Sequence, residues 1–154
     1  MGSSLLLVLA ACGGGAHVFR ADGITVRVPA GWHVSTRPLN GVSDPVQRFV
    51  LSSVSVPPNA SSGNGYLPPS DAVLAQVLEE EPADYSNPWP KRPAHFKIGR
   101  LGRMETLDGK RWGELLFRDH ERHLYVFVWV GRHAGGPQLT ALLHALDGLQ
   151  VRAP

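Results

Sequence analysis

The chain has 154 residues, of which 43% are hydrophobic and 18% are charged. This length suits one globular domain, and the apolar content is too high for a disordered chain. The formal net charge of +2 does not indicate a nucleic-acid binder, in which basic residues crowd one face. The opening uncharged run is shorter than the roughly 20 apolar residues of a spanning helix, so the sequence does not predict a polytopic membrane protein.

The beginning of the chain carries an apolar run that is followed by a cysteine and three glycines. Residues 5–11 are apolar and end in alanines, which is typical of the hydrophobic core and cleavage region of a secretory signal. No Lys or Arg precedes this run, and in this respect the segment departs from a normal signal. Cys12 is the only cysteine of the chain, so it cannot form an internal disulfide.

The element Leu9-Ala10-Ala11-Cys12 resembles the lipobox of bacterial lipoproteins. This resemblance implies cleavage before Cys12 and attachment of a diacylglyceryl group to its sulfur, with membrane lipid as the partner. Two acyl chains anchor a protein stably, because each buried methylene contributes about 0.8 kcal/mol. We therefore expect a signal peptide over 1–11, the lipidated Cys12 and a flexible tether over 12–21, and a single domain over 22–154. The alternative is a buried N-terminal strand or helix with an inert core cysteine.

The first half of the expected domain is rich in β patterns. Alternating apolar and polar residues predict a half-buried strand over 24–28. The turn residues 29–31 follow it, and 32–35 can return as the second arm of a hairpin. A further β-rich run covers 46–53, whereas the Pro-, Gly-, Asn- and Ser-rich residues 57–70 predict an exposed, mobile loop.

Residues 71–81 fit two structures. Ser70 and Asp71 resemble a helix start, and good helix formers follow them. The apolar residues on both parities of 73–78 instead suit a strand that is buried on both faces, and the flanking prolines favour this strand. The proline-rich residues 82–95 then predict a long irregular connection.

The C-terminal third predicts a hairpin. The β-rich runs 111–118 and 123–130 are separated by the polar residues 119–122. Because residues 124–130 are apolar on both parities, we expect a central strand that is covered on both faces.

A helix follows this hairpin, with Pro137 at its first position. Its apolar stripe has the spacing i, i+3, i+4 and i+7 and consists of Leu139, Leu142, Leu143 and Leu146. Gly148 is expected to end the helix in a left-handed conformation before a short closing strand over 149–151. Antiparallel strands with helices packed on them predict an α+β domain.

The turn in Val28-Pro29-Ala30-Gly31-Trp32, the later antiparallel meander, and the closing helix with its Leu-x-Val strand resemble the PsbP-like fold. The resemblance covers roughly residues 22–152. It implies an α/β/α sandwich around an antiparallel sheet, acting as a binding or assembly module rather than as an enzyme. It carries no functional residue over to this chain.

Motifs for catalysis or cofactors are not found in the sequence. No Ser lies in a Gly-x-Ser-x-Gly elbow, and residues 99–102 lack the spacing of a phosphate loop. The densest cluster of His and acidic residues, 119–123, favours a solvated turn over a metal site, which needs three or four ligands. The consecutive acids 79–81 likewise favour a solvated end of an element. We expect no catalytic residue, no metal and no cofactor.

Basic residues outnumber acidic ones by seven to two from Lys91 to Arg111. They form either an ordinary solvated face or a basic strip toward anionic lipid headgroups or cell-wall polymer. Trp89, between two prolines, either packs or serves as an exposed anchor for a partner.

Together these observations predict a membrane-anchored lipoprotein on the extracytoplasmic face of the cell membrane. It would be a non-enzymatic binding or assembly module for an envelope protein or polymer and not for nucleic acid, with 57–70 and 82–95 as its contact loops. The alternatives are a small-ligand carrier or enzyme with a pocket between sheet and loops, and a soluble intracellular assembly factor.

Overall fold

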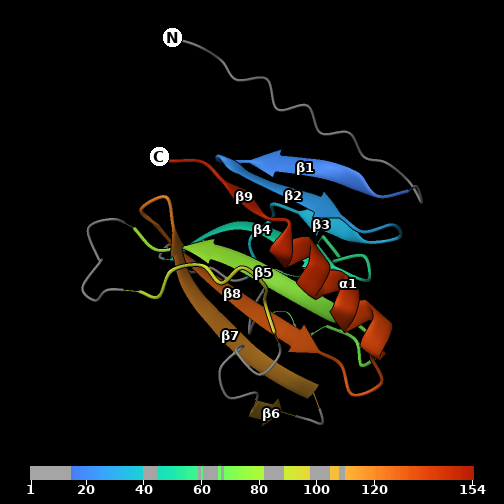
Figure 1. Cartoon of the computed structure of the whole chain (residues 1–154). Helices are drawn as coiled ribbons and strands as arrows, with labels where there is room; N and C mark the ends of the chain where they lie inside the picture. Colours follow the sequence, from blue (N-terminus) through green and yellow to red (C-terminus); the bar gives the residue numbers. More distant parts are fainter. Residues whose placement is uncertain are drawn as a thin grey trace.

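The computed structural model describes most of the chain from residue 15 onward. The described residues are 15–39, 45–58, 60, 66, 68–81, 89–97, 105–107 and 110–154. Cys12 and the predicted signal peptide, 1–11, lie outside them. The described residues form nine strands and one helix, and the strands make two antiparallel sheets (Figure 1).

The elements follow one another in chain order along these stretches. They are β1 (His17–Ala21), β2 (Ile24–Val28), β3 (His33–Ser35), β4 (Val46–Ser52), β5 (Val73–Glu79), β6 (Glu105–Leu107), β7 (Lys110–Asp119), β8 (Arg122–Val130), α1 (Gly136–Asp147) and β9 (Gln150–Val151). The small sheet has the order β1-β2-β9, and the large sheet has the order β3-β4-β5-β8-β7-β6.

The predicted α+β class, with helices packed on a sheet as a PsbP-like α/β/α sandwich, is wrong. Among the described residues, strands dominate and α1 is the only helix. The other segment with helical signals, 71–81, contains the strand β5, and all seven residues of β5 are buried. A strand in the middle of a sheet can bury an apolar run on both faces, and this burial overrides the helical propensity of the segment.

The small sheet and α1 together cover one face of the large sheet (Figure 1). Alternate residues of β8 from Leu124 to Val130 point into this core and are fully buried. The predicted stripe of α1 is confirmed at three leucines, whereas Leu143 is only partly buried. The buried residues of α1 are Leu139, Leu142, Ala145 and Leu146.

The opposite face of the large sheet is covered by loop residues. Leu39, Val50 and Leu74 form a small buried cluster there, and Ala60 and Tyr66 pack against it. Ala60 and Tyr66 belong to the predicted exposed loop, so these two residues serve instead as a partial cover. Burial also raises the pKa of the Tyr66 hydroxyl above its ordinary value. On β8 the cover is incomplete, since Tyr125, Phe127 and Trp129 are only partly buried.

The second half of the flexible tether predicted over 12–21 is corrected by the structure, whereas Cys12 and the next two residues lie outside the described residues. Residues 17–21 form β1, which pairs with all of β2, from His17 opposite Val28 to Ala21 opposite Ile24. The ordered sheet therefore starts at His17, because backbone pairing and the ring contact between Phe19 and Phe49 fix this segment.

The C-terminal end of α1 is capped by a distant arginine. Gly148 has φ −82°, so the predicted left-handed conformation is wrong. Arg92 donates instead to the carbonyl oxygens of Leu146 (3.0 Å), Asp147 (2.8 Å) and Leu149. A guanidinium at this position satisfies the free carbonyls and complements the negative end of the helix dipole, so a left-handed glycine is not required.

Candidate functional site

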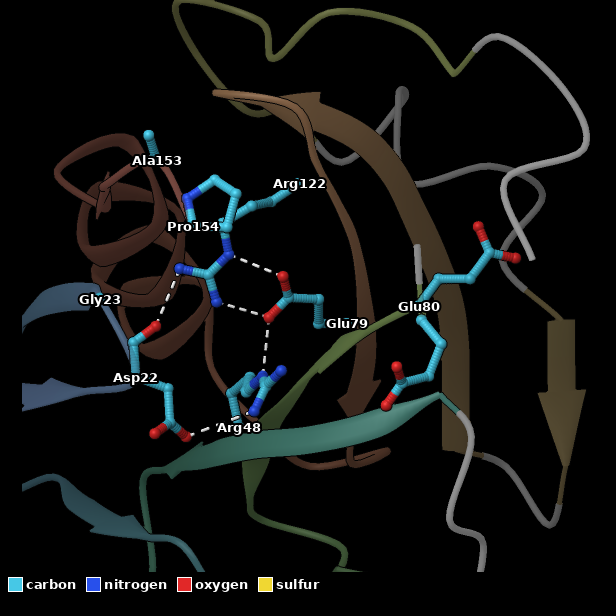
Figure 2. Close-up of a pocket in the computed structure, with 9 residues that line it drawn as sticks. Asp22, Gly23, Arg48, Glu79, Glu80, Arg122, Ala153 and Pro154 are labelled. Atoms are coloured by element: carbon cyan, nitrogen blue, oxygen red, sulfur yellow. Dashed lines mark hydrogen bonds and ion pairs between the residues drawn. The ribbon is translucent and has the colours of Figure 1, made fainter. Parts of the chain in front are cut away.

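An open cavity of about 350 Å³ lies at the end of the molecule where both sheets bring turns and strand ends together (Figure 2). The β1–β2 turn, the middle of β4, the end of β5, the start of β8 and the residues after β9 contribute to it. Its lining residues are Asp22, Gly23, Arg48, Glu79, Glu80, Glu81, Arg122, Ala153 and Pro154.

A network of ion pairs around Glu79 forms the base of the cavity. The Nε of Arg122 donates to Glu79 Oε1 at 2.6 Å, and its Nη2 donates to Oε2 of the same carboxylate. The Nε of Arg48 also donates to Glu79 Oε2, at 2.7 Å. Only 6% of the Arg122 side chain and 9% of the Glu79 side chain are exposed, so this pairing is shielded from water.

The same arginines connect the large sheet to the small one. Arg122 Nη1 donates to the carbonyl oxygen of Asp22 at 2.8 Å, and Arg48 Nη1 lies 3.5 Å from Asp22 Oδ2. Figure 2 shows Arg48 and Arg122 on either side of Glu79, with Asp22 beside both. The network therefore joins the β1–β2 turn to the end of β5 and the start of β8. We call these four residues, Asp22, Arg48, Glu79 and Arg122, the latch.

Local backbone features put these side chains in reach of one another. The pairing of β4 with β5 shifts register between Gln47 and Phe49, and Arg48 lies at this bulge. A bulge re-aims a side chain out of the regular alternation. Gly23 has φ +77°, and a Cβ there would lie 2.9 Å from Arg122 Nη1. Glycine at this position both permits the turn and leaves room for the guanidinium.

The network holds Glu79 in its ionised form. Burial alone would raise the pKa of Glu79, but hydrogen bonds and charge attraction from Arg122 and Arg48 lower it below its ordinary value. A general acid or base works best with a pKa near the operating pH, and the shift of Glu79 goes the other way. Its carboxylate thus suits electrostatic binding and structural pairing.

The rim of the cavity adds negative charge. Glu80 and Glu81 extend beyond the end of β5, and Glu80 Oε2 lies 3.3 Å from His123 Nδ1. The side chains of the lining include four carboxylates and two guanidinium groups, so their formal charge is −2. A cavity of this composition attracts a positively charged group more than an anion.

The histidine and acidic side chains of residues 119–123 point to different partners. Asp119 pairs with Arg92 at 3.2 Å and with His120 Nδ1 at 2.8 Å, and Glu121 is exposed in the turn. His123 points elsewhere and stacks on Trp89. Within the stretches that the structure describes, no three His, Cys, Asp or Glu side chains come together as metal ligands.

Trp89 packs against its own chain. Its ring stacks on His123 with centroids 4.7 Å apart and lies perpendicular to the ring of Tyr125 with centroids 4.5 Å apart. These contacts favour the packing interpretation over an exposed anchor.

The basic strip that was one of two interpretations of the residues from Lys91 to Arg111 is divided in the structure. Arg92 caps α1, and Lys91 forms an isolated bridge with Arg118 near the end of β7. Arg111 lies at the opposite end of β7, beside Val130. The described members therefore do not form one continuous strip.

The sequence prediction missed the latch around Glu79. Its members are 26 to 100 residues apart in the chain, and their spacing gives no motif. Glu79 was predicted to be solvated with its two acidic neighbours, yet it is buried. The sequence contains one signal for this network: a charged residue stands at the end of an apolar strand, as Glu79 does in β5 and Arg122 does in β8.

No protein-family model matches the chain, and no curated protein matches it either. Along the described part of the chain, no helix has both the length and the apolar character to cross a bilayer.

Proposed function

We propose that this protein is a lipid-anchored, non-enzymatic binding module on the extracytoplasmic face of the cell membrane. The lipobox-like element that ends at Cys12 supports the anchor, because its thiol is the group that a diacylglyceryl modification requires. The ionised, paired state of Glu79 supports a binding role for the cavity rather than proton transfer.

The observation that carries the proposal is the position of β1 between the anchor and the cavity. His17 begins β1 five residues after Cys12, a distance of at most about 18 Å for an extended chain. The strand then runs to Asp22, which lines the cavity. A lipid on Cys12 would keep the His17 end close to the membrane and leave the cavity open at the far end.

The cavity suits a partner with a positively charged group. Its four carboxylates outnumber its two guanidinium groups, and Glu79 already pairs with both arginines. Glu80 and Glu81 add two further carboxylates to the lining. A segment of an envelope protein that presents lysine or arginine fits this charge better than an anionic cell-wall polymer does.

The anchor is tested by the intact mass of the protein taken from the membrane fraction of its own host. We expect cleavage before Cys12 and the added mass of a diacylglyceryl group. The variant Cys12→Ala should keep the circular dichroism spectrum of the folded domain and move to the soluble fraction. An unmodified wild-type mass in the soluble fraction would contradict the anchor.

The binding role is tested by titrating the protein with a trilysine peptide in a calorimeter. The double variant Glu80→Gln/Glu81→Gln should weaken binding by roughly tenfold, since each partly exposed charge contributes modestly. The double variant Asp71→Asn/Glu114→Gln is the matched control, because it removes the same charge away from the cavity. Equal binding by both variants would refute a cationic ligand in the cavity.

A further inference from the structure

We propose that the end of the domain opposite the cavity docks on the headgroups of anionic lipids. This inference rests on the proposed lipid anchor and names the surface that the anchor holds against the membrane. We call this surface the anchor-side end. It consists of the start of β1, the β2–β3 turn over 29–32, the start of β7, and residues 131–135 between β8 and α1.

The topology brings these segments to one end of the molecule (Figure 1). His17 lies opposite Val28, and the chain needs only four more residues to reach β3. From there the sheet register continues across the large sheet at the same end. The successive partners are His33 with Ser52, Ser52 with Leu74, Val73 with Val130, and Val130 with Arg111.

The anchor-side end presents cations. Arg27, Arg111 and Arg132 are all exposed, and the exposed residues His33 and His133 belong to the same end. None of the three arginines forms an ion pair with another described residue. Among the side chains that the structure describes at this end, Asp71 is the only carboxylate.

The carboxylates of the domain gather at the cavity end. Seven of them lie on the turns and strand ends around the cavity or on the adjacent end of α1. They are Asp22, Glu79, Glu80, Glu81, Asp119, Glu121 and Asp147. Seven basic residues lie among these carboxylates, so the cavity end carries no net charge. They are Arg20, Arg48, Lys91, Arg92, Arg118, Arg122 and Arg152. Among the described side chains the anchor-side end is net positive, so a negatively charged membrane attracts it more strongly than the cavity end.

An exposed apolar side chain lies beside these cations. Val18 is 50% exposed and is one of two large apolar side chains that are exposed in the described residues. It lies opposite Arg27 in the β1–β2 register. An apolar side chain next to basic residues suits the boundary between headgroups and acyl chains. The short link of five residues to Cys12 would hold this part of the surface near that boundary.

The test uses the full chain with Cys12→Ser, so that no lipid contributes. Its binding is measured by co-sedimentation with phosphatidylcholine vesicles and with vesicles of equal parts phosphatidylcholine and phosphatidylglycerol. The apolar run 5–11 acts on both kinds of vesicle, so the ratio of the two affinities isolates the charge effect. We expect a clear preference for phosphatidylglycerol that declines as salt is added.

The decisive variant is Arg27→Gln/Arg111→Gln/Arg132→Gln. The matched control is Arg20→Gln/Arg118→Gln/Arg152→Gln, which removes three exposed arginines that lie toward the cavity end. The first variant should lose affinity for the anionic vesicles on the order of 100-fold, and the control should lose less than about threefold.

Equal losses in the two variants, or no preference for phosphatidylglycerol, would overturn the inference. So would binding of soluble polyphosphate at the anchor-side end without binding of vesicles, because this result would assign the surface to an anionic polymer. The vesicle assay does not depend on lipidation, whereas the intact mass reports the anchor. A failure of the docking surface can therefore be told apart from a failure of the proposed anchor.

Discussion

The two ends of the domain use charge in opposite ways. At the cavity end, Arg122 and Glu79 are buried and joined by two hydrogen bonds. At the anchor-side end, Arg27, Arg111 and Arg132 are exposed. A buried pair fixes the fold, because breaking it leaves an uncompensated charge away from water. Exposed cations contribute little to stability and remain available to an external surface.

This difference separates residues that build the domain from residues that are available for recognition. A substitution in the latch should act on the free energy of unfolding. A substitution at the anchor-side end should act on membrane affinity and on its dependence on salt.

Glu79→Gln should lower the free energy of unfolding by about 3–5 kcal/mol, because Arg122 would stay buried without its counter-charge. Urea denaturation followed by circular dichroism measures the loss. Glu80→Gln is the control, since its partner His123 is a single histidine at 3.3 Å. We expect that control to cost less than about 1 kcal/mol. Equal losses for the two variants would mean that the latch does not join the sheets.

Gly131→Ala should destabilise the anchor-side end by about 3 kcal/mol through overpacking. A Cβ at this position would lie 2.2 Å from the carbonyl oxygen of Ser70 and 2.8 Å from that of Pro69. Both are backbone atoms and cannot rotate away. Gly136→Ala is the control, because nothing lies within 4 Å of its added Cβ. If both variants unfold at the wild-type temperature, the close approach of these two loops is refuted.

The pH dependence of stability should also depend on Glu79. Its pKa in the folded state is lower than its ordinary value of 4.5, which applies to the unfolded chain. The ionised carboxylate therefore stabilises the fold above about pH 4.5, and this contribution is lost as the pH falls through the folded-state pKa. Between pH 5 and pH 3, the stability of the wild type should fall more steeply than that of Glu79→Gln. Parallel profiles would show that the carboxylate does not titrate as argued.

Local patterns predicted the individual elements better than they predicted the architecture. The strand over 24–28, the C-terminal hairpin and the helix from Pro137 are confirmed, because each depends on the periodicity of its own residues. The class was wrong because the sequence does not show what covers the second face of the large sheet. Loop residues such as Ala60 and Tyr66 supply that cover, and their composition predicted exposure.

The site was harder to predict for the same reason. Arg48 meets Glu79 through a bulge, and Arg92 caps α1 from more than 50 residues away. Neither contact has a signature in the spacing of residues. The prediction for Cys12 concerns only nearby residues, and it stays a prediction because Cys12 lies outside the described part.

The smallest expected effect concerns two turns at the cavity end. Both the Asp22-Gly23 turn and the His120-Glu121 turn have positive φ at their two central residues, as two-residue hairpin loops require. Asp-Gly suits this geometry, whereas His120 (φ 47°) and Glu121 (φ 64°) carry side chains that disfavour it.

His120→Asn/Glu121→Gly should therefore raise the free energy of unfolding by about 1 kcal/mol, measured by urea denaturation. The latch should be unaffected, because neither residue belongs to it. Both residues lie in the turn just before Arg122, and Arg122 is held by its strand pairing with Asp119 across the hairpin. The pH profile of the variant should then run parallel to that of the wild type, displaced upward. A loss of stability would instead show that the side chains of the turn, including the contact of His120 with Asp119, contribute more than the strain costs. The cavity end would in that case depend on exposed charges as well as on its buried pair.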